Sequence, residues 1–371
     1  MDAKRTVPFF PYSSFFTSQE AELTPVLLEV LRRGAFILQK DVTEFEKNIA
    51  EYIGAKHVIG VANATDALIL ALRAAGIGAG DEVIFSSHTF VATAAAIHFA
   101  GAIPVPVECG ADHLIDPEAV KKAITPKTRA IMPTQLNGRT CRMDEIQKIA
   151  DQHKLLVIED SAQGLGSQYK GKFAGTFGTA GVLSFYPAKI LGCFGDGGAV
   201  ITNDDSIAEK VLLLRDHGRN HDGQVVIWGL NSRLDNMQAA VLNYYFKNFS
   251  ETVRRRREIA QMYQEGLGSI KQLTLPPPPV TGQNHFDTYQ NYEMEAERRD
   301  ELKAALKEQG IATLIQWGGS AVHQFKELGF QARLPTTEKL FTRLLMLPMN
   351  THLSNQDILY ICGCIQKFYK I

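Results

Sequence analysis

The sequence has few cysteines, no excess of either charge and no long apolar run. Five cysteines among 371 residues are an odd number with spacings that match no zinc motif, so we expect reduced thiols and no metal site. Lys and Arg total 39 against 40 for Asp and Glu, which argues against nucleic acid or an anionic membrane as a partner. No run approaches the roughly 18 apolar residues that span a bilayer, and no apolar signal region opens the sequence. These absences predict a cytoplasmic protein.

Short apolar runs alternate with amphipathic stretches from about residue 56 to 218. The stretches 65–75, 116–123 and 142–153 have helical periodicity, and the glycine-rich stretch 164–181 is typical of a loop. Apolar runs that alternate with helices predict an α/β large domain with a mostly parallel sheet between helices. The expected strands are 58–62, 81–85, 103–107, 130–133, 155–159, 182–186 and 199–202.

A proline run at 276–279 marks a change of organisation. Before it, 235–265 has the pattern of one nearly unbroken helix, and we interpret its basic run at 254–257 as a solvated face because the whole chain is not basic. After it, 288–296 indicates a strand, 299–309 a helix, and Ser354 the N-cap of a last helix. The sequence predicts a large domain at 1–250, which includes the N-terminal segment, and a small C-terminal α+β domain at 251–371. We expect the first 33 residues to pack back on one of these domains.

One lysine lies in an unusual setting. Lys189 follows the strand-like run 182–186 and precedes Gly195-Asp196-Gly197-Gly198. A lysine taken alone is nearly always a surface residue. In a pocket lined by glycine, however, its amine can lose its proton more easily and attack a carbonyl carbon. Lys189 is therefore a candidate for a Schiff-base lysine.

Two further segments occur where open α/β sheets bind ligands. Asp160 follows the strand-like run 155–159 at the carboxyl edge of the predicted sheet, although a helix cap or a turn would also explain it. Asn63-Ala64-Thr65 joins a strand to a helix whose first N–H groups suit a phosphate, and an ordinary N-cap is the alternative. No Gly-Lys-Ser/Thr follows, so this is not a P-loop, and the absence of Gly-x-Gly-x-x-Gly disfavours a Rossmann oxidoreductase.

In this order, the three segments resemble the DegT/DnrJ/StrS family of sugar aminotransferases, within the fold-type I enzymes that use pyridoxal phosphate (PLP). The resemblance covers nearly the whole chain, and it rests on many short pieces that are each weak and together strong. Besides the segments above, the pieces are Gly34-Ala35-Phe36-Ile37-Leu38, Gly80-Asp81-Glu82-Val83, Thr89-Phe90-Val91-Ala92-Thr93, Gly101-Ala102-Ile103-Pro104-Val105, Glu159-Asp160-Ser161-Ala162-Gln163 and Asn231-Ser232-Arg233-Leu234-Asp235.

The resemblance implies roles at the matching positions. Lys189 would hold PLP as a Schiff base, and Asp160 would keep the ring nitrogen protonated so that the ring accepts electrons. Gln163 would lie near the ring hydroxyl, and Phe90, for which a core position is the alternative, would stack on the ring face. The other implied positions are Ala64, Thr65 and Ser184 at the phosphate, Asn231 reaching the phosphate from the neighbouring subunit of a homodimer, and His323 and Tyr186 as candidate substrate contacts.

The implied reaction moves an amino group from L-glutamate to a keto nucleotide-sugar, which makes an amino sugar for surface polysaccharide, glycan or natural-product biosynthesis. Enzymes for 4-keto sugars commonly have Gly-Glu-Gly-Gly after the lysine, so Asp196 favours a 3-keto substrate. Gln135 stands where the family often has a histidine, a departure that concerns substrate preference. The alternatives are a PLP-dependent sugar dehydratase, in which histidine replaces the lysine, and a non-catalytic PLP-binding regulator, for which no residues are left to form a DNA-binding domain.

Overall fold

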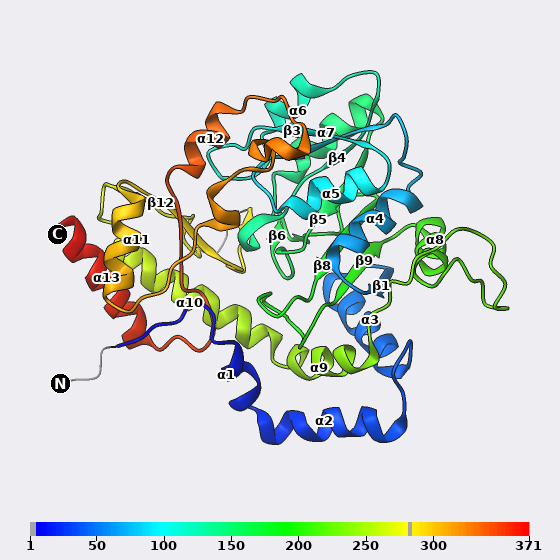
Figure 1. Ribbon diagram of the computed structural model, residues 1–371, viewed down its shortest axis with the longest axis horizontal. Helices are drawn as coiled ribbons and strands as arrows, with labels where there is room; N and C mark the ends of the chain where they lie inside the picture. The colour runs from blue at the N-terminus through cyan, green and yellow to red at the C-terminus, as the bar shows by residue number, and fades with distance from the viewer. Residues whose placement is uncertain (1–4, 281–283, 371) are drawn as a thin grey trace.

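A computed structural model describes residues 5–280 and 284–370 (Figure 1). It confirms the predicted α/β class: a seven-stranded sheet has the order β1-β9-β8-β5-β4-β2-β3. All its neighbours pair in parallel except β9, which runs antiparallel to β1 and β8. The strands are β1 (His57–Val61), β2 (Glu82–Ser86), β3 (Ile103–Val107), β4 (Thr128–Met132), β5 (Leu156–Asp160), β8 (Ala180–Ser184) and β9 (Gly198–Thr202).

Helices cover both faces of this sheet (Figure 1). Successive strand residues point to opposite faces, and in β2 Val83 and Phe85 pack into one apolar cluster while Ile84 packs into another. Both faces are therefore buried, as expected of parallel strands joined by helices. The helices are α3 (Lys40–Ile53), α4 (Ala64–Ala74), α5 (Val91–Phe99), α6 (Pro117–Ala123), α7 (Met143–His153), α8 (Asp205–Arg215) and α9 (Asn236–Phe246).

A further apolar cluster, separate from the two on the large sheet, surrounds a three-stranded sheet of order β10-β12-β13. Val7 belongs to this cluster, so the N-terminal segment packs on the C-terminal elements there, while the next helices run beside α9. Ser354 caps the last helix as predicted, because its hydroxyl accepts from Asp357 N. The elements are α1 (Tyr12–Thr17), α2 (Glu20–Arg33), α10 (Phe249–Leu267), β10 (Leu273–Thr274), β12 (Tyr292–Ala296), α11 (Arg299–Glu308), α12 (Pro335–Phe341), β13 (Leu344–Leu347) and α13 (Asn355–Tyr369).

Several details differ from the sequence-based expectation. The helix expected over 235–265 is two helices, α9 and α10, which separate at residues 247–248. The stretch 164–181 includes two short strands, β6 (Gln168–Tyr169) and β7 (Lys172–Phe173), which form a small sheet with β11 (His285–Phe286). The expected division at 250 stays a prediction and falls in the first turn of α10.

The basic run 254–257 is not uniformly solvated. Arg254 is exposed and pairs with Glu251 and Glu258, but Arg256 is only 3% exposed and donates through Nη1 to three backbone carbonyls. The interpretation of the run as a solvated face was therefore wrong for Arg256, which turns into the protein. Within the described part of the chain, no helix has both the length and the apolar character needed to cross a membrane.

Candidate active site

Asp160 ends β5 at the carboxyl edge of the large sheet, where the sequence predicted it. The residue is 5% exposed, and its Oδ2 accepts a 2.7 Å hydrogen bond from Thr93 Oγ1 in the first turn of α5. Its Oδ1 accepts from Ala162 N at 3.2 Å. Burial raises the pKa of Asp160, and the two donors and the charge of Lys189 oppose that rise. The carboxylate is thus held in place at the base of a buried site.

Lys189 lies on the connection between β8 and β9, within reach of the charge of Asp160. Although the residue as a whole is half-buried, burial of its amine lowers the pKa of Lys189 to about 8, and Asp160 opposes this shift. A lysine with this pKa has a substantial uncharged fraction near neutral pH. The structure therefore brings together the predicted amine and the predicted carboxylate.

The predicted phosphate residues meet where α4 begins. Ala64 and Thr65 form its first turn, and Asn63 caps it by accepting from Asp66 N at 2.8 Å. The first N–H groups of a helix have no partner within the helix, so they are available to an anion. Ser184 pairs with Gly198 in the adjacent strands β8 and β9.

Gly198 allows these segments to approach. A Cβ atom on Gly198 would lie 2.4 Å from the carbonyl carbon of Asn63 and 2.7 Å from Ala64 N. Such distances are shorter than any tolerated contact, so only glycine fits. The close contact places the start of α4 beside Ser184, as the resemblance implied.

Two aromatic residues near this site are exposed. Phe90 is 53% exposed at the N-cap of α5, one turn before Thr93, so it is not the core phenylalanine of the alternative interpretation. An exposed ring directly before the helix that holds Asp160 is available for stacking. Tyr186 is 48% exposed, and burial together with the neighbouring Tyr186 raises the pKa of Tyr12 in α1.

The structure gives two glutamines distinct surroundings. Gln163, three residues after Asp160, is half-buried, and its Oε1 accepts from Asn137 N at 2.9 Å. Gln135 is fully buried and donates a 2.7 Å hydrogen bond to Glu159. Glu159 also accepts from the N–H groups of three residues that follow β7. The departure at Gln135 thus lies beside a buried structural carboxylate, and nothing here connects it with substrate preference.

His323 and Asn231 lie in contrasting places. His323 is 5% exposed, with Nδ1 2.7 Å from Ser87 Oγ and Nε2 3.2 Å from Glu338. Both ring nitrogens therefore have partners within the protein, and a role in substrate contact stays a prediction. Asn231 is exposed at the end of the loop after α8, which projects from the rest of the protein (Figure 1). Within the described residues, Asn231 itself makes only a bridge to Asp216, while the next residue, Ser232, accepts a 3.2 Å hydrogen bond from Ala62 N; the reach of Asn231 to a partner's phosphate site stays a prediction.

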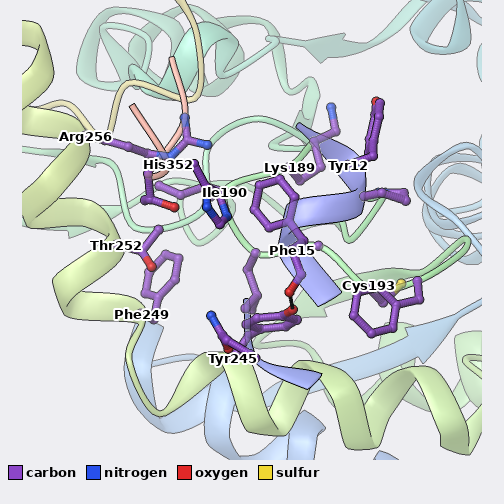
Figure 2. A pocket seen from close by; sticks show the side chains of 16 residues that line it. Tyr12, Phe15, Lys189, Ile190, Cys193, Tyr245, Phe249, Thr252, Arg256 and His352 are labelled. Carbon is purple, nitrogen blue, oxygen red and sulfur yellow. Dashed lines mark hydrogen bonds between the residues drawn. The ribbon is translucent and has the colours of Figure 1, made fainter. Parts of the chain in front are cut away.

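A cavity of about 280 Å³ adjoins the Lys189 loop (Figure 2). Its walls come from α1, the loop after Lys189, α9, α10 and the loop before α13. Arg256 and His352 lie together on one side of it, and Tyr245 and Phe249 on another (Figure 2). Of the residues predicted to contact PLP, only Lys189 lines this cavity.

Sequence reasoning missed two residues that hold the site. Thr93 binds Asp160, and its only signal was that it follows Thr89 by one helical turn, in a segment quoted for the resemblance. Gln290 is 5% exposed; its Oε1 accepts from Ile190 N at 2.6 Å and its Nε2 donates to Ala188 O at 2.8 Å. Gln290 therefore binds the backbone on both sides of Lys189. No local sequence pattern indicates a contact between residues 100 positions apart.

Comparison with known proteins places the chain in a family. The profile of the DegT/DnrJ/EryC1/StrS aminotransferase family matches residues 17–366. A protein of Geobacillus stearothermophilus named pleiotropic regulatory protein is 42% identical over 98% of this chain and 99% of its own length. The dTDP-3-amino-3,4,6-trideoxy-alpha-D-glucose transaminase of Streptomyces venezuelae is 38% identical over 98% of this chain and 96% of its own length.

The fold agrees with a solved structure. The crystal structure of S. venezuelae DesV in complex with a ketimine intermediate superposes with a TM-score of 0.94 at 38% identity, covering 99% of both chains. The fold-type I prediction is confirmed by this match together with the mostly parallel sheet. The chain belongs to the DegT/DnrJ/EryC1/StrS aminotransferase family.

Proposed function

We propose that this protein transfers an amino group from L-glutamate to a nucleotide-linked 3-keto sugar, with PLP bound at Lys189. The observation that carries the proposal is the placement of Asp160 and Lys189: Asp160 ends β5 and Lys189 follows β8, and these are adjacent parallel strands, so both residues lie at the carboxyl edge of the sheet. A lysine with a lowered pKa beside a buried carboxylate is the arrangement that a Schiff-base enzyme requires. Membership of an aminotransferase family supports the same reaction class.

The residues fit the aldehyde, the ring nitrogen and the phosphate of PLP. An aldehyde needs an uncharged amine, and burial lowers the pKa of Lys189 to about 8. A pyridine nitrogen that keeps its proton needs a carboxylate, and Asp160 is held by Thr93. A phosphate needs N–H and hydroxyl donors, which the first turn of α4 and Ser184 supply beside Gly198.

When bound, PLP supplies an electrophilic carbon and a ring that withdraws electrons from the substrate. The residues around it hold and transfer protons. Lys189 Nζ can carry a proton to or from a substrate carbon, because a pKa near 8 lets the amine exchange protons near neutral pH. Asp160 stabilises a positive charge placed against it, and the exposed ring of Phe90 is available to limit movement normal to a flat ligand.

The preference for a 3-keto sugar is supported by relatives as well as by Asp196. The S. venezuelae relative at 38% identity is named as a transaminase for a 3-amino sugar. A 4-keto substrate is the less favoured reading, and L-glutamate is proposed as the donor from the resemblance alone.

A homodimer is part of the proposal. The loop before Asn231 exposes consecutive apolar side chains, with Val225 at 68% and Trp228 at 96%. Exposed apolar residues in a row are unfavourable in water and are typical of an interface. We infer that this loop packs on a second copy of the chain, where Asn231 would reach the partner's phosphate site.

The test uses the purified protein with PLP. The wild type should acquire visible absorbance, lose it on addition of L-glutamate, and then convert a 3-keto nucleotide-sugar to an amino sugar faster than the 4-keto isomer. Lys189→Ala should do none of these. Unchanged absorbance after glutamate would refute the donor step, release of ammonia would indicate a dehydratase, and full biological activity of Lys189→Ala in cells would favour a regulator.

A further inference from the structure

The segment Gln290–Asn291 enters the site from the side of the three-stranded sheet, directly before β12. Gln290 holds the backbone on both sides of Lys189, as described above. Its neighbour Asn291 donates through Nδ2 to Gln163 Oε1 at 3.2 Å and to Asn137 Oδ1 at 2.8 Å. The two adjacent residues before β12 therefore bind loops of the large sheet: Gln290 binds the Lys189 loop, and Asn291 binds Gln163 and Asn137.

Gly138 makes this approach possible. Its φ is +82°, and a Cβ there would lie 2.5 Å from Gln290 N and 2.6 Å from Tyr289 N. Gly138 O also accepts a 2.8 Å hydrogen bond from Thr288 N. The backbone before Asn291 thus packs directly against the loop after β4, where a side chain would separate them.

The hydrogen bonds fix which end of each amide faces which partner. Asn137 N is a backbone N–H and can only donate, so the Gln163 atom 2.9 Å away is the carbonyl oxygen. At the other end, Asn137 Nδ2 lies 3.1 Å from a carboxylate oxygen of Glu293, which accepts when ionised. Asn137 Oδ1 then faces donors, Asn291 Nδ2 and, at 2.6 Å, Gln316 Nε2. Both ends of the network thus specify one orientation.

Glu293 is a firm anchor for this network. It is 3% exposed, and His113 Nδ1 lies 2.9 Å from its Oε1. Burial opposes ionisation of Glu293, but the neighbouring His88 and His113 outweigh it and lower its pKa to about 2. The carboxylate therefore remains ionised and accepts hydrogen bonds throughout the neutral range.

These contacts determine the orientation of the Gln163 side chain. Its carbonyl oxygen has two donors, Asn137 N and Asn291 Nδ2, whereas its Nε2 has no hydrogen-bond partner among residues 5–280 and 284–370. The free end of this side chain is therefore an N–H donor. We propose that Asn291 and Asn137 are positioning residues that orient Gln163 as a hydrogen-bond donor to the ring hydroxyl oxygen of PLP, while Gln290 positions the backbone of Lys189.

This inference rests on the proposed function. An N–H donor stabilises the ionised hydroxyl oxygen, so it lowers the pH at which the proton shared between that oxygen and the Lys189 nitrogen is lost. Asn291→Asp would replace a donor to Gln163 Oε1 by an acceptor, so that the glutamine amide would no longer be held with Nε2 toward the ring hydroxyl. The midpoint of the pH titration of visible absorbance should then rise by about one pH unit.

A double-mutant cycle separates this effect from the new charge. Asn291→Asp should shift the midpoint in the wild-type background and have little effect in a Gln163→Leu background. Gln290→Leu should weaken PLP retention and leave the midpoint near the wild-type value. An equal shift in both backgrounds, or no shift in either, would overturn the positioning role.

Two further variants keep the test decisive. Asn137→Gly retains the backbone donor and suits the left-handed φ of 57° at this position, but removes the acceptor for Asn291; a smaller upward shift is expected, and an unchanged midpoint would count against the network even if Asn291→Asp failed to fold. Asn243→Ala is the matched control, because Asn243 is also half-buried and bonds Asn48 and Asp41 at a distance from the site. If wild type and Asn243→Ala show no visible absorbance with PLP, the proposed function itself fails, and this inference fails with it.

Discussion

Thr93 Oγ1 donates a 2.7 Å hydrogen bond to Oδ2 of Asp160, and both residues are buried. The helix α5 thereby fixes the carboxylate that ends β5. The position of this carboxylate depends on Thr93, a residue to which no part in the reaction is assigned. Phe90 is the N-cap of the same helix, so the proposed ring-stacking residue and Thr93, which holds the carboxylate, lie within one turn.

Thr93→Val should weaken PLP binding by about tenfold, because a hydrogen bond to a charged group contributes about 1.5–3 kcal/mol. The pKa of Asp160 should rise further, since a donor to its ionised form is lost. Equilibrium dialysis with PLP measures the affinity. Thr202→Val is the control, because Thr202 is also buried and donates to Thr179 O at 2.8 Å, at the edge of the sheet opposite the one where Asp160 lies. Equal losses of PLP affinity in the two variants would contradict the role of Thr93 in holding Asp160.

Removing the buried amine should stabilise the protein without PLP. Burial lowers the pKa of Lys189 from 10.5 to about 8, so the folded state binds fewer protons than the unfolded state between these values. Stability therefore rises with pH across this window, and the cost of burying the ammonium is greatest below pH 8. Lys189→Met should be more stable than wild type at pH 7, by up to about 3 kcal/mol, with the gap closing toward pH 10.5. Denaturant unfolding at several pH values measures it, and a gap that does not vary with pH would refute the assignment.

His113 should contribute stability that is lost in alkali. Burial lowers its pKa, but the hydrogen bonds and charges of Glu293 and Glu295 outweigh burial and raise it to about 9. A raised pKa gives stability that is complete below about pH 6.5 and disappears as pH passes 9. His113→Asn should lower the free energy of unfolding by on the order of 1–3 kcal/mol at pH 6 and change little above pH 10. A loss of stability in His113→Asn that is the same at pH 6 and at pH 10 would contradict the role of this imidazole.

Trp228→Glu should disrupt the proposed homodimer. Trp228 is 96% exposed in the projecting loop after α8, and a charge there would oppose burial against a second copy. Analytical ultracentrifugation should detect a shift toward monomer, with a parallel loss of PLP because Asn231 no longer reaches the partner. Leu359→Glu is the control, because Leu359 is another exposed apolar residue, 63% exposed on α13. A dimer that survives Trp228→Glu at micromolar concentration would rule out this interface.

Local patterns in the sequence were enough to predict the large sheet and to single out two candidate site residues. The strand 103–107 was predicted at its observed limits because it appears as a short apolar run, although it is an edge strand in which only Val107 is buried. Lys189 and Asp160 were predicted as site residues because each comes soon after a strand-like run, and the carboxyl ends of strands in an α/β sheet lie at one edge; in the structure Asp160 ends β5 and Lys189 lies on the connection after β8. The break between α9 and α10 was missed because no glycine or proline occurs at 247–248.

The supporting network could not be predicted, because its contacts join residues far apart in the sequence. Asn137 and Asn291 are 154 positions apart, and each alone is an ordinary polar residue near a turn. Arg256 was assigned to a solvated face since its neighbours are charged, yet it lies on the buried side of α10, where it bonds to the carbonyls of Tyr289, Gln290 and Met349. Such partners become visible only when the chain is folded.

The contact between Gly198 and the turn at Asn63 links two distant parts of the gene. Because the turn leaves no room for a Cβ atom at Gly198, the turn and β9 have to be compatible in any protein that combines them. A chimera of two family members that took residues 61–66 from one parent and residues 184–198 from the other would retain its cofactor only where the second parent also has glycine at this place. Breakpoints for recombining such enzymes should therefore be chosen so that both segments travel together.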